Sequence, residues 1–342
     1  MIRNFTIYCI LGSAAAISSQ YNVFGLAEAL ERGKNVRNPH TELADVHADN
    51  WEPITINVDD HPKEVYIASP DWFVGKGSAA DALDIPWGGR IYLAEKPNVD
   101  PESIFKPKLL GGYLQYTVDL SSSTCGCVAA LYTALLPGRT PSGEYEKSGD
   151  GLYYCDASAV DGNYCTEFDV MEANKWSWRS TPHACVEPEN GFYSSCDKSG
   201  QCHVSHTQLG EKGFGPGAEY TIDTELPVTV RADFSEQDGH FVSYRVTLSQ
   251  ARDGHQQILT GNCPHQLPAL TDSLNEGMAI LVSNWSTDDS LEWLQEGSCE
   301  GTCGRHNLSI SDIRIGTSGA VEEEEWEPVE YAWGNEPCAT ND

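Results

Sequence analysis

Short segments in which apolar and polar residues alternate follow one another through most of this chain. In 228–234 and 244–248 every second residue is apolar, as in a strand with one buried face. Gly, Pro, Asn and Asp separate most of these runs, and long helical patterns are scarce. The pattern predicts an all-β fold, a two-sheet antiparallel β-sandwich. Strands are expected at 90–93, 112–120, 128–136, 220–223, 228–234, 241–248, 277–285 and 308–315.

The two ends of the chain differ from this pattern. A positive start, an apolar run from Phe5 to Ile17 and small residues around Ser18 are typical of a secretory signal peptide over 1–19, with a buried N-terminal helix as the alternative. A short helix is expected at Leu26–Arg32. Residues 320–342 carry eight acidic and no basic residues, which predicts a solvated tail. No later run approaches the length of a membrane-spanning helix.

Charge narrows the classes of partner. The chain has 21 Lys and Arg against 51 Asp and Glu, a formal charge of −30. Phosphates would be repelled, so nucleic acid and anionic membrane surfaces are excluded as partners. The hydrophobic fraction of 40% is enough for a packed core, so a disordered chain is excluded as well.

Twelve cysteines support the assignment to an oxidising compartment. Cys9 falls in the predicted signal peptide, and the eleven others indicate a disulfide framework in an exported chain. The close pairs 125/127 and 299/303 leave zinc binding as an alternative, although no histidines stand at ligand spacing around them. Because eleven is odd, one thiol is left over, and Cys338 in the tail is expected to be unpaired.

Three carboxylates lie close together in the segment 164–174. Glu167 and Asp169 are two residues apart, so they share one face of a strand. Glu172 would point to the other face unless one bulge follows Asp169, and bulges are common beside active sites. Two carboxylates about 5–5.5 Å apart are what retaining glycoside hydrolysis requires. A solvated acidic strand and a calcium site are the alternatives.

The surrounding residues resemble glycoside hydrolase family 7, the cellobiohydrolases and endoglucanases. The carboxylate strand continues into Glu-Ala-Asn at 172–174 and Thr-Pro-His-x-Cys at 181–185, as in that family. The resemblance covers about residues 88–319. Further matching segments are 89–93, 118–132, 154–156, 209–224, 277–285 and 297–316.

The resemblance implies a concanavalin-like jelly roll with an open substrate cleft, and a role for each matching residue. Glu167 would be the nucleophile, Asp169 its supporting carboxylate and Glu172 the general acid/base. The implied substrate-binding residues are His183 near the acid/base, Trp285 and Trp293 as sugar-stacking platforms, and Arg90 and Tyr132 in the cleft. Core packing is the alternative for each tryptophan. Four implied disulfides are Cys125–Cys299, Cys155–Cys165, Cys185–Cys196 and Cys202–Cys263; adjacency to the first adds Cys127–Cys303 as a fifth.

The chain also departs from the family pattern. Residues 20–87 match it poorly and are assigned to a divergent N-terminal part of the sandwich. Polar cleft residues of the family are replaced, and the tunnel-forming loops are short, which favours attack within a polysaccharide chain. The positions that differ are Val128, Ser158, Met171 and Gly191.

The sequence therefore predicts a secreted, monomeric endo-β-1,4-glucanase that acts on cellulose or related β-glucans without a cofactor or metal. A β-1,3/1,4-glucanase of the laminarinase and lichenase group is the alternative enzyme. A non-catalytic cell-wall polysaccharide-binding protein is the alternative of another class. Glycosylation sequons begin at Asn284 and Asn307, of which at most one is expected to be used.

Overall fold

The computed structural model describes residues 53–69, 75–76, 79–98, 100–147, 153–160, 162–251, 254–287, 291–295, 299 and 302–317. All of them belong to one compact unit, His47–Asp342. The predicted signal peptide, the helix Leu26–Arg32, the acidic tail and Cys338 lie outside these residues. Within the described part of the chain, no helix is both long and apolar enough to cross a membrane.

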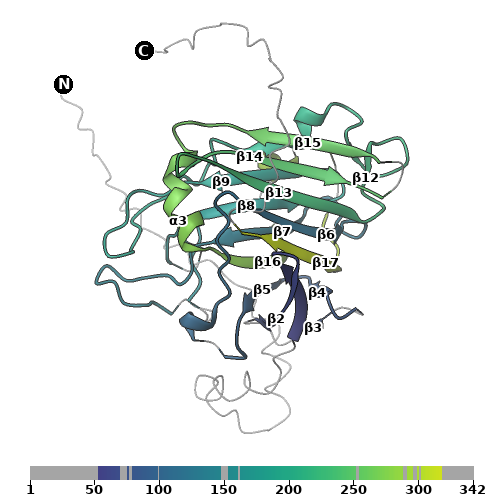
Figure 1. The fold of residues 1–342 in the computed structure, drawn as a ribbon. Helices are drawn as coiled ribbons and strands as arrows, with labels where there is room; N and C mark the ends of the chain where they lie inside the picture. The colour runs from purple at the N-terminus through teal and green to yellow at the C-terminus, as the bar shows by residue number, and fades with distance from the viewer. Residues whose placement is uncertain are drawn as a thin grey trace, which may run out of the picture. The chain divides into compact units, whose positions relative to one another are not determined.

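Fifteen strands form one hydrogen-bonded sheet that folds over on itself (Figure 1). In spatial order its main path is β10 (Val204–Ser205), β9 (Trp178–His183), β8 (Glu167–Ala173), β7 (Cys127–Ala134), β16 (Ala279–Ser286), β5 (Gly89–Ala94), β2 (His61–Ala68), β1 (Pro53–Val58), β17 (Asn307–Gly316), β6 (Tyr113–Asp119), β13 (Val228–Gln237), β14 (His240–Ser249) and β15 (Gln256–Gly261). Off this path, β4 (Leu83–Pro86) pairs with β17 and with β3 (Gly75–Lys76), and β11 (Phe214–Gly215) pairs with β12 (Ile222–Asp223).

Helical segments within the described ranges are short. They are three 3₁₀ turns, η4 (Pro101–Ser103), η5 (His206–Leu209) and η6 (Leu267–Leu270), and two helices, α3 (Thr271–Glu276) and α4 (Glu292–Gln295). The predicted all-β class is confirmed, and nearly all strand pairs are antiparallel as expected. Two described pairs, β1 with β17 and β11 with β12, are parallel.

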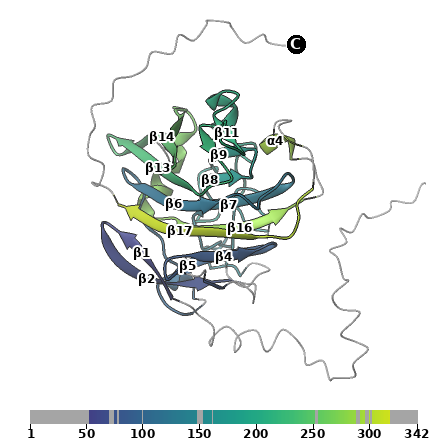
Figure 2. The same ribbon diagram turned by 90° about the vertical axis from the view of Figure 1, so that its right-hand side faces the viewer.

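The main core lies between the two halves of the folded sheet. In Figure 2 the labels β14, β13, β6, β17 and β1 run down one side, and β9, β8, β7, β16 and β5 run down the other. Phe168 of β8 makes edge-to-face ring contacts with Phe234 of β13 at 5.1 Å and with Tyr244 of β14 at 5.0 Å between centroids. Such pairs add stabilisation beyond burial of their area. The contacts show that β8 packs across the core from β13 and β14.

A hairpin in the poorly matching N-terminal region connects the two halves. Strands β1 and β2 are joined through Asp59 and Asp60, both with positive φ (49° and 61°). Positive φ at both central residues is the geometry of a type I′ turn, whose twist suits a two-residue hairpin. β2 pairs with β5 and β1 with β17, so residues 53–68 hydrogen-bond to both halves of the sheet. The sequence reading offered no role for this segment.

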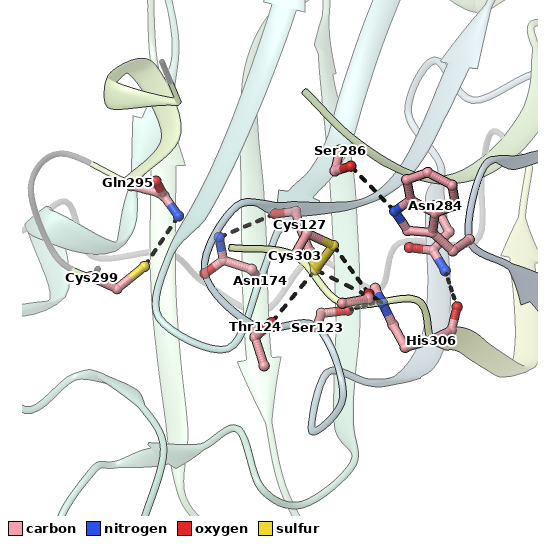
Figure 3. Close-up of a disulfide and its surroundings, with 12 residues drawn as sticks. Ser123, Thr124, Cys127, Asn174, Asn284, Ser286, Gln295, Cys299, Cys303 and His306 are labelled. Atoms are coloured by element: carbon pink, nitrogen blue, oxygen red, sulfur yellow. Dashed lines mark hydrogen bonds between the residues drawn. A yellow bond between two sulfur atoms is a disulfide. The ribbon is translucent and has the colours of Figure 1, made fainter. Parts of the chain in front are cut away.

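The described residues contain five disulfides, which have the predicted pairing. Figure 3 shows Cys127–Cys303 beside His306, at the start of β7. Its neighbour Cys125–Cys299 ties the same two regions together. The sulfurs of the two close pairs are therefore oxidised and cannot bind zinc as thiolates, which excludes the zinc alternative for them.

Six predicted strands coincide with observed ones to within a few residues at each end: those at 90–93, 112–120, 228–234, 241–248, 277–285 and 308–315. The prediction at 128–136 corresponds to β7, which ends two residues earlier. The prediction at 220–223 shortens to β12. The strands that were not predicted are β1, β2, β3, β4, β9, β10, β11 and β15.

Candidate active site

A β-bulge in β8 brings the three carboxylates to one face of the sheet. Opposite β9, Asp169 pairs with Thr181 and Glu172 with Arg179, so β8 contains one extra residue between the two carboxylates. Val170 and Met171, although consecutive, both belong to the main core. Because two successive side chains turn inward, the alternation changes phase, and Glu172 joins Glu167 and Asp169 on the opposite face. The predicted bulge is therefore confirmed.

We call the face of β5, β16, β7, β8 and β9 that turns away from the main core the site face. Core residues mark the other face: Ile91, Leu93, Leu131, Phe168, Trp178, Ile280 and Val282. Alternation then places on the site face Arg90, Tyr132, Glu167, Asp169, Glu172, Arg179, His183 and Trp285. Seven of the eight predicted site residues therefore lie on the site face, and the exception is Trp293. Arg179, which was not predicted, lies on the same face.

Glu167 is held by a loop closed by a disulfide. The backbone N–H of Ala157 donates to its Oε2 at 2.9 Å, and Cys155–Cys165 closes the loop that carries this N–H. Burial raises the pKa of Glu167 well above its ordinary value, and the charges of Asp169 and Asp156 raise it further. The charge of His183 and the Ala157 hydrogen bond act in the opposite direction, because they favour the carboxylate.

Asp169 and His183 are directly paired. Nε2 of His183 lies 3.0 Å from Oδ2 of Asp169, and Nδ1 donates to the carbonyl oxygen of Asp197 at 2.6 Å. Burial, with the charge of Asp156, raises the pKa of Asp169 to about 8, and Arg179 acts in the opposite direction. Because Nδ1–H is bonded to the carbonyl, Nε2 is the ring nitrogen that faces the Asp169 carboxyl. The charge of Asp169 in turn raises the pKa of both Glu167 and Glu172.

Glu172 is the most exposed of the three carboxylates, since Glu167 and Asp169 are buried and it is half-buried. Burial raises its pKa to about 8, and the charge of Asp169 contributes in the same direction. His183 and Arg179 lower this pKa. A carboxylic acid that keeps its proton near neutral pH and reaches solvent is suited to general acid catalysis.

Tyr132 and Arg90 are both in contact with Tyr154. The hydroxyl of Tyr132 lies 3.1 Å from that of Tyr154, and the guanidinium carbon of Arg90 lies 3.6 Å from the centroid of the Tyr154 ring. Tyr132 is buried, and burial raises its pKa above the ordinary range. The structure brings both predicted cleft residues to the site face, packed in a cation–π and hydroxyl cluster.

The two tryptophans differ in exposure. Trp285, at the end of β16, is half-buried and packs against the site-face cluster that contains Tyr132. Trp293, in α4, is 37% exposed, and its backbone carbonyl accepts a hydrogen bond from Arg179 at 2.7 Å. Neither indole is part of the main core.

A metal ion is the alternative use of this constellation. The ligand atoms of Glu167, Asp169 and His183 lie within 4.8 Å of one another. Calcium takes six to eight oxygen ligands, whereas this group offers two carboxylates and an imidazole. The donor set therefore does not suit the calcium alternative.

Three residues that support the site were not predicted. Asp156 follows Cys155 in a segment the resemblance includes, and its Oδ1 accepts the N–H groups of Ser158 and Val160. Asp197 positions His183 through its carbonyl, a contact that leaves no pattern in the sequence. Arg179 is two and four residues before Thr181 and His183, so recognising β9 as a strand would have placed it on the same face.

One departure from the family pattern has a local explanation. Gly191 has a φ of 77°, and a Cβ there would come within 2.6 Å of Cδ of Arg139. The Arg139 side chain occupies the space and stacks on Tyr145, with its guanidinium carbon 4.5 Å from the ring centroid. A larger residue at 191 would be excluded by both the backbone conformation and this contact.

Comparisons with known proteins agree with the fold and with the resemblance seen in the sequence. The family model for glycosyl hydrolase family 7 matches residues 158–260, which include β8 and β9. Endoglucanase type C of Fusarium oxysporum is 25% identical over 296 residues, covering 68% of each chain. Endoglucanase EG-1 of Hypocrea jecorina is 28% identical over 257 residues, covering 66% of this chain and 52% of its own. The chain thus spans about two thirds of the length of the first relative and about half of the second.

Solved structures share the fold. An endoglucanase I in complex with cellobiose superimposes with a TM-score of 0.63 at 18% identity, covering 80% of this chain and 98% of its own. A cellobiohydrolase from Daphnia pulex superimposes with a TM-score of 0.61 at 17% identity and the same coverage. These neighbours support the jelly-roll sandwich. The resemblance seen in the sequence is confirmed: the chain is similar to glycoside hydrolase family 7 over residues 158–260, and the curated relatives named here are endoglucanases.

Proposed function

We propose that this protein is a retaining glycoside hydrolase that cleaves internal β-1,4-glucosidic bonds of cellulose or a related β-glucan. The observation that carries the proposal is the bulge at Val170, which puts Glu167, Asp169 and Glu172 on one face of the sheet. The curated relatives named above are endoglucanases, and one structural neighbour is a complex with cellobiose. Site chemistry and relatives therefore point to the same class of substrate.

The proposed reaction has two displacements. Glu167 attacks the anomeric carbon while Glu172 gives its proton to the departing glycosidic oxygen, so the C–O bond breaks and a glycosyl–Glu167 ester forms. Glu172, now a carboxylate, takes a proton from water, whose oxygen attacks the same carbon and releases Glu167. Two inversions return the β configuration.

The charge distribution supports these assignments. Glu172 has a pKa of about 8, so it holds the proton that the first step requires. Glu167 accepts a hydrogen bond from the backbone N–H of Ala157, which favours the anion that must attack. His183 lies 3.0 Å from Asp169 and fixes the position of this carboxyl between the two glutamates.

Attack within the chain, secretion and a monomeric state are part of the proposal. Short loops around the site face favour an open cleft, and an open cleft admits a polysaccharide at internal bonds. Five disulfides in the described residues suit an oxidising, extracellular compartment.

Reducing-sugar release from carboxymethylcellulose, barley glucan and laminarin tests the function, with Glu167→Gln as control. We expect the fastest release from carboxymethylcellulose and none from the variant. Release from laminarin or barley glucan alone would favour the laminarinase type of enzyme. No release from any of them, with binding retained, would identify a non-catalytic polysaccharide-binding protein.

Stereochemistry tests the mechanism separately. Proton NMR of early product should show the β-anomer first. An α-anomer formed first would overturn Glu167 as nucleophile, because an inverting enzyme uses its second carboxylate to activate water.

A further inference from the structure

Arg179 ties together three segments beside the proposed acid/base. Its Nη1 donates to the carbonyl oxygen of Trp293 at 2.7 Å, and its Nη2 donates to the carbonyl oxygen of Ser199 at 3.2 Å. Its Nε donates to Oγ1 of Thr181 on the same strand at 3.3 Å. One guanidinium thus joins β9, the 197–201 loop and α4. Its planar fork of donors is what makes this simultaneous contact feasible.

Arg179 lies next to the proposed acid/base Glu172, so its contacts bear on how substrate binds there. Arg179 is the direct cross-strand partner of Glu172 in the β8–β9 register. A general acid protonates the oxygen of the departing sugar, so that sugar leaves on the Glu172 side of the scissile bond. The element that Arg179 holds next to Glu172 is therefore on the leaving-group side.

The hydrogen bond from Arg179 to the Trp293 carbonyl oxygen fixes the residue that carries an exposed indole. Its indole is 37% exposed, while Leu291 and Leu294 on the same short segment are buried against the site-face cluster. The guanidinium carbon of Arg179 lies 5.9 Å from the centroid of the indole ring. At the end of the segment, Nε2 of Gln295 donates to Sγ of Cys299 (Figure 3). Leu291 and Leu294 thus anchor the segment that carries Trp293, while part of the indole is open to solvent.

We propose that Arg179 is a positioning residue that fixes Trp293 as a sugar platform on the leaving-group side of Glu172. The inference rests on the proposed hydrolase function and deepens it: the resemblance already implies Trp293 as a sugar platform, and the new element is the arginine that holds it in place. Apolar faces of glucose units lie well on indole rings. The arginine acts through the Trp293 carbonyl and not on the substrate bond itself.

The effect of the Arg179 charge can be separated from the effect of its hydrogen bonds by two different substitutions. Arg179 lowers the pKa of both Asp169 and Glu172. Arg179→Lys keeps the charge but cannot span two carbonyl oxygens with a rigid fork. Arg179→Met removes charge and fork together. The two variants should therefore differ in pH dependence and resemble each other in substrate binding.

The test compares two substrates that share the proposed nucleophilic chemistry. Cellopentaose places sugars on the leaving-group side, whereas an aryl cellobioside places only the aryl group there. For both Arg179 variants we expect kcat/KM on cellopentaose to fall about tenfold more than on the aryl cellobioside, which corresponds to about 1.4 kcal/mol. The loss should appear mainly in KM, because the platform contacts only a sugar on the leaving-group side. In Arg179→Met alone the alkaline limb of the pH profile should move to higher pH. Arg314→Met, which removes an exposed arginine of β17, is the matched control and should change neither value.

A double-mutant cycle decides whether Arg179 acts through Trp293. Trp293→Ala should reproduce the selective loss on cellopentaose, and adding Arg179→Lys to it should cost little more. Additive losses, or equal losses on both substrates, would overturn the proposal. Arg179→Lys keeps the test decisive if Arg179→Met does not fold.

A readout without turnover distinguishes failure of this inference from failure of the proposed function. If the wild-type protein hydrolyses neither substrate, the function fails while the positioning role is still measured by amide hydrogen exchange. Exchange at residues 291–295 should accelerate in Arg179→Met and Arg179→Lys relative to wild type and Arg314→Met. Unchanged exchange in both Arg179 variants would refute the positioning role.

Discussion

Nε2 of His183 lies 3.0 Å from Oδ2 of Asp169, while the other ring nitrogen of His183 is bonded to a backbone carbonyl. The histidine is therefore fixed in orientation, and the carboxyl it faces stands between the two proposed catalytic glutamates along β8. The charge of His183 lowers the pKa of both glutamates. This pair thus controls the protonation of the site without itself belonging to the two displacements.

Replacing His183 with alanine should lower kcat by about ten- to a hundredfold, because Asp169 loses a charge-assisted hydrogen bond. Without the nearby positive charge Glu167 ionises at higher pH, so the acid limb of the pH profile should shift upward. Steady-state kinetics across the pH range measure both effects. His240→Ala, in an exposed position of β14, is the control. An unchanged acid limb would contradict the proposed influence of His183 on Glu167.

The pH profile of the wild-type protein on cellopentaose should be a bell shifted to higher pH than two ordinary carboxyls would produce. Activity requires ionised Glu167 and protonated Glu172. Burial raises the pKa of Glu172 to about 8, so the alkaline limb should fall near that pH, and the acid limb should lie above 4.5 because the pKa of Glu167 is raised as well. Because Glu167 and Glu172 interact, the apparent pKa values read from the two limbs of the profile belong to the pair of carboxyls. An alkaline limb near the pKa of an exposed glutamate would argue against Glu172 as the acid.

Glu172→Gln should stabilise the fold at neutral pH and not in acid. Below the pKa of a glutamate in the unfolded chain, both states hold the proton and the variant changes nothing. As pH rises from about 4.5 to about 8, the unfolded chain loses the proton while the folded site keeps it, so unfolding becomes easier in the wild type. The gain from the substitution should therefore grow across that window and level off above it. Thermal melts at several pH values measure this, and an equal gain at all pH values would contradict the raised pKa.

Azide should partly restore activity to Glu172→Ala. The alanine variant can still form the glycosyl–Glu167 ester from an aryl glycoside with a good leaving group, but it lacks the base that activates water. Azide needs no such base, so a β-glycosyl azide should accumulate, and mass spectrometry with NMR identifies it. An α-azide from Glu172→Ala, or a β-azide from Glu167→Ala, would instead exchange the roles of the two glutamates.

Removing the Cys127–Cys303 disulfide should cost less stability than its sequence separation of 176 suggests. Cys125–Cys299 already joins the same regions, so the second disulfide closes an extra loop of only about eight residues. Chain-entropy reasoning then predicts a loss of about 2.5 kcal/mol, against about 5 kcal/mol for the isolated long loop. Denaturant unfolding of a Cys127→Ser, Cys303→Ser double variant measures the difference. A loss near the larger value would show that the two disulfides act independently.

Most strands of this protein could be predicted because their pattern is local. β13 and β14 alternate apolar and polar residues along their own sequence, and the observed strands coincide with that alternation. β9 was not predicted, because its sequence Trp-Arg-Ser-Thr-Pro-His has polar residues on both faces. It is a strand because β8 and β10 pair with it on either side. The polar edge strand β15 was missed for the same reason.

The sequence predicts which carboxylates form the candidate site, but it does not predict the hydrogen bonds that hold them. Glu167 and Asp169 share a face by strand periodicity alone, and the spacing to Glu172 demanded a bulge. The contacts from Ala157 to Glu167 and from Asp197 to His183 come from loops whose conformation no residue pattern encodes. Arg179 was overlooked because its importance depends on the register of β9 against β8.

The sequence by itself determined the class of fold, the three carboxylates and the disulfide framework, because these depend on side-chain periodicity and on motifs that stand together in the chain. Only the tertiary structure decided where the bulge falls and which side chains surround the acids. The bulge lies at Val170 because the core accepts two consecutive apolar side chains there. The raised pKa values of Glu167, Asp169 and Glu172 arise from burial beside one another, and burial is produced by strands and loops distant in sequence packing over the same face.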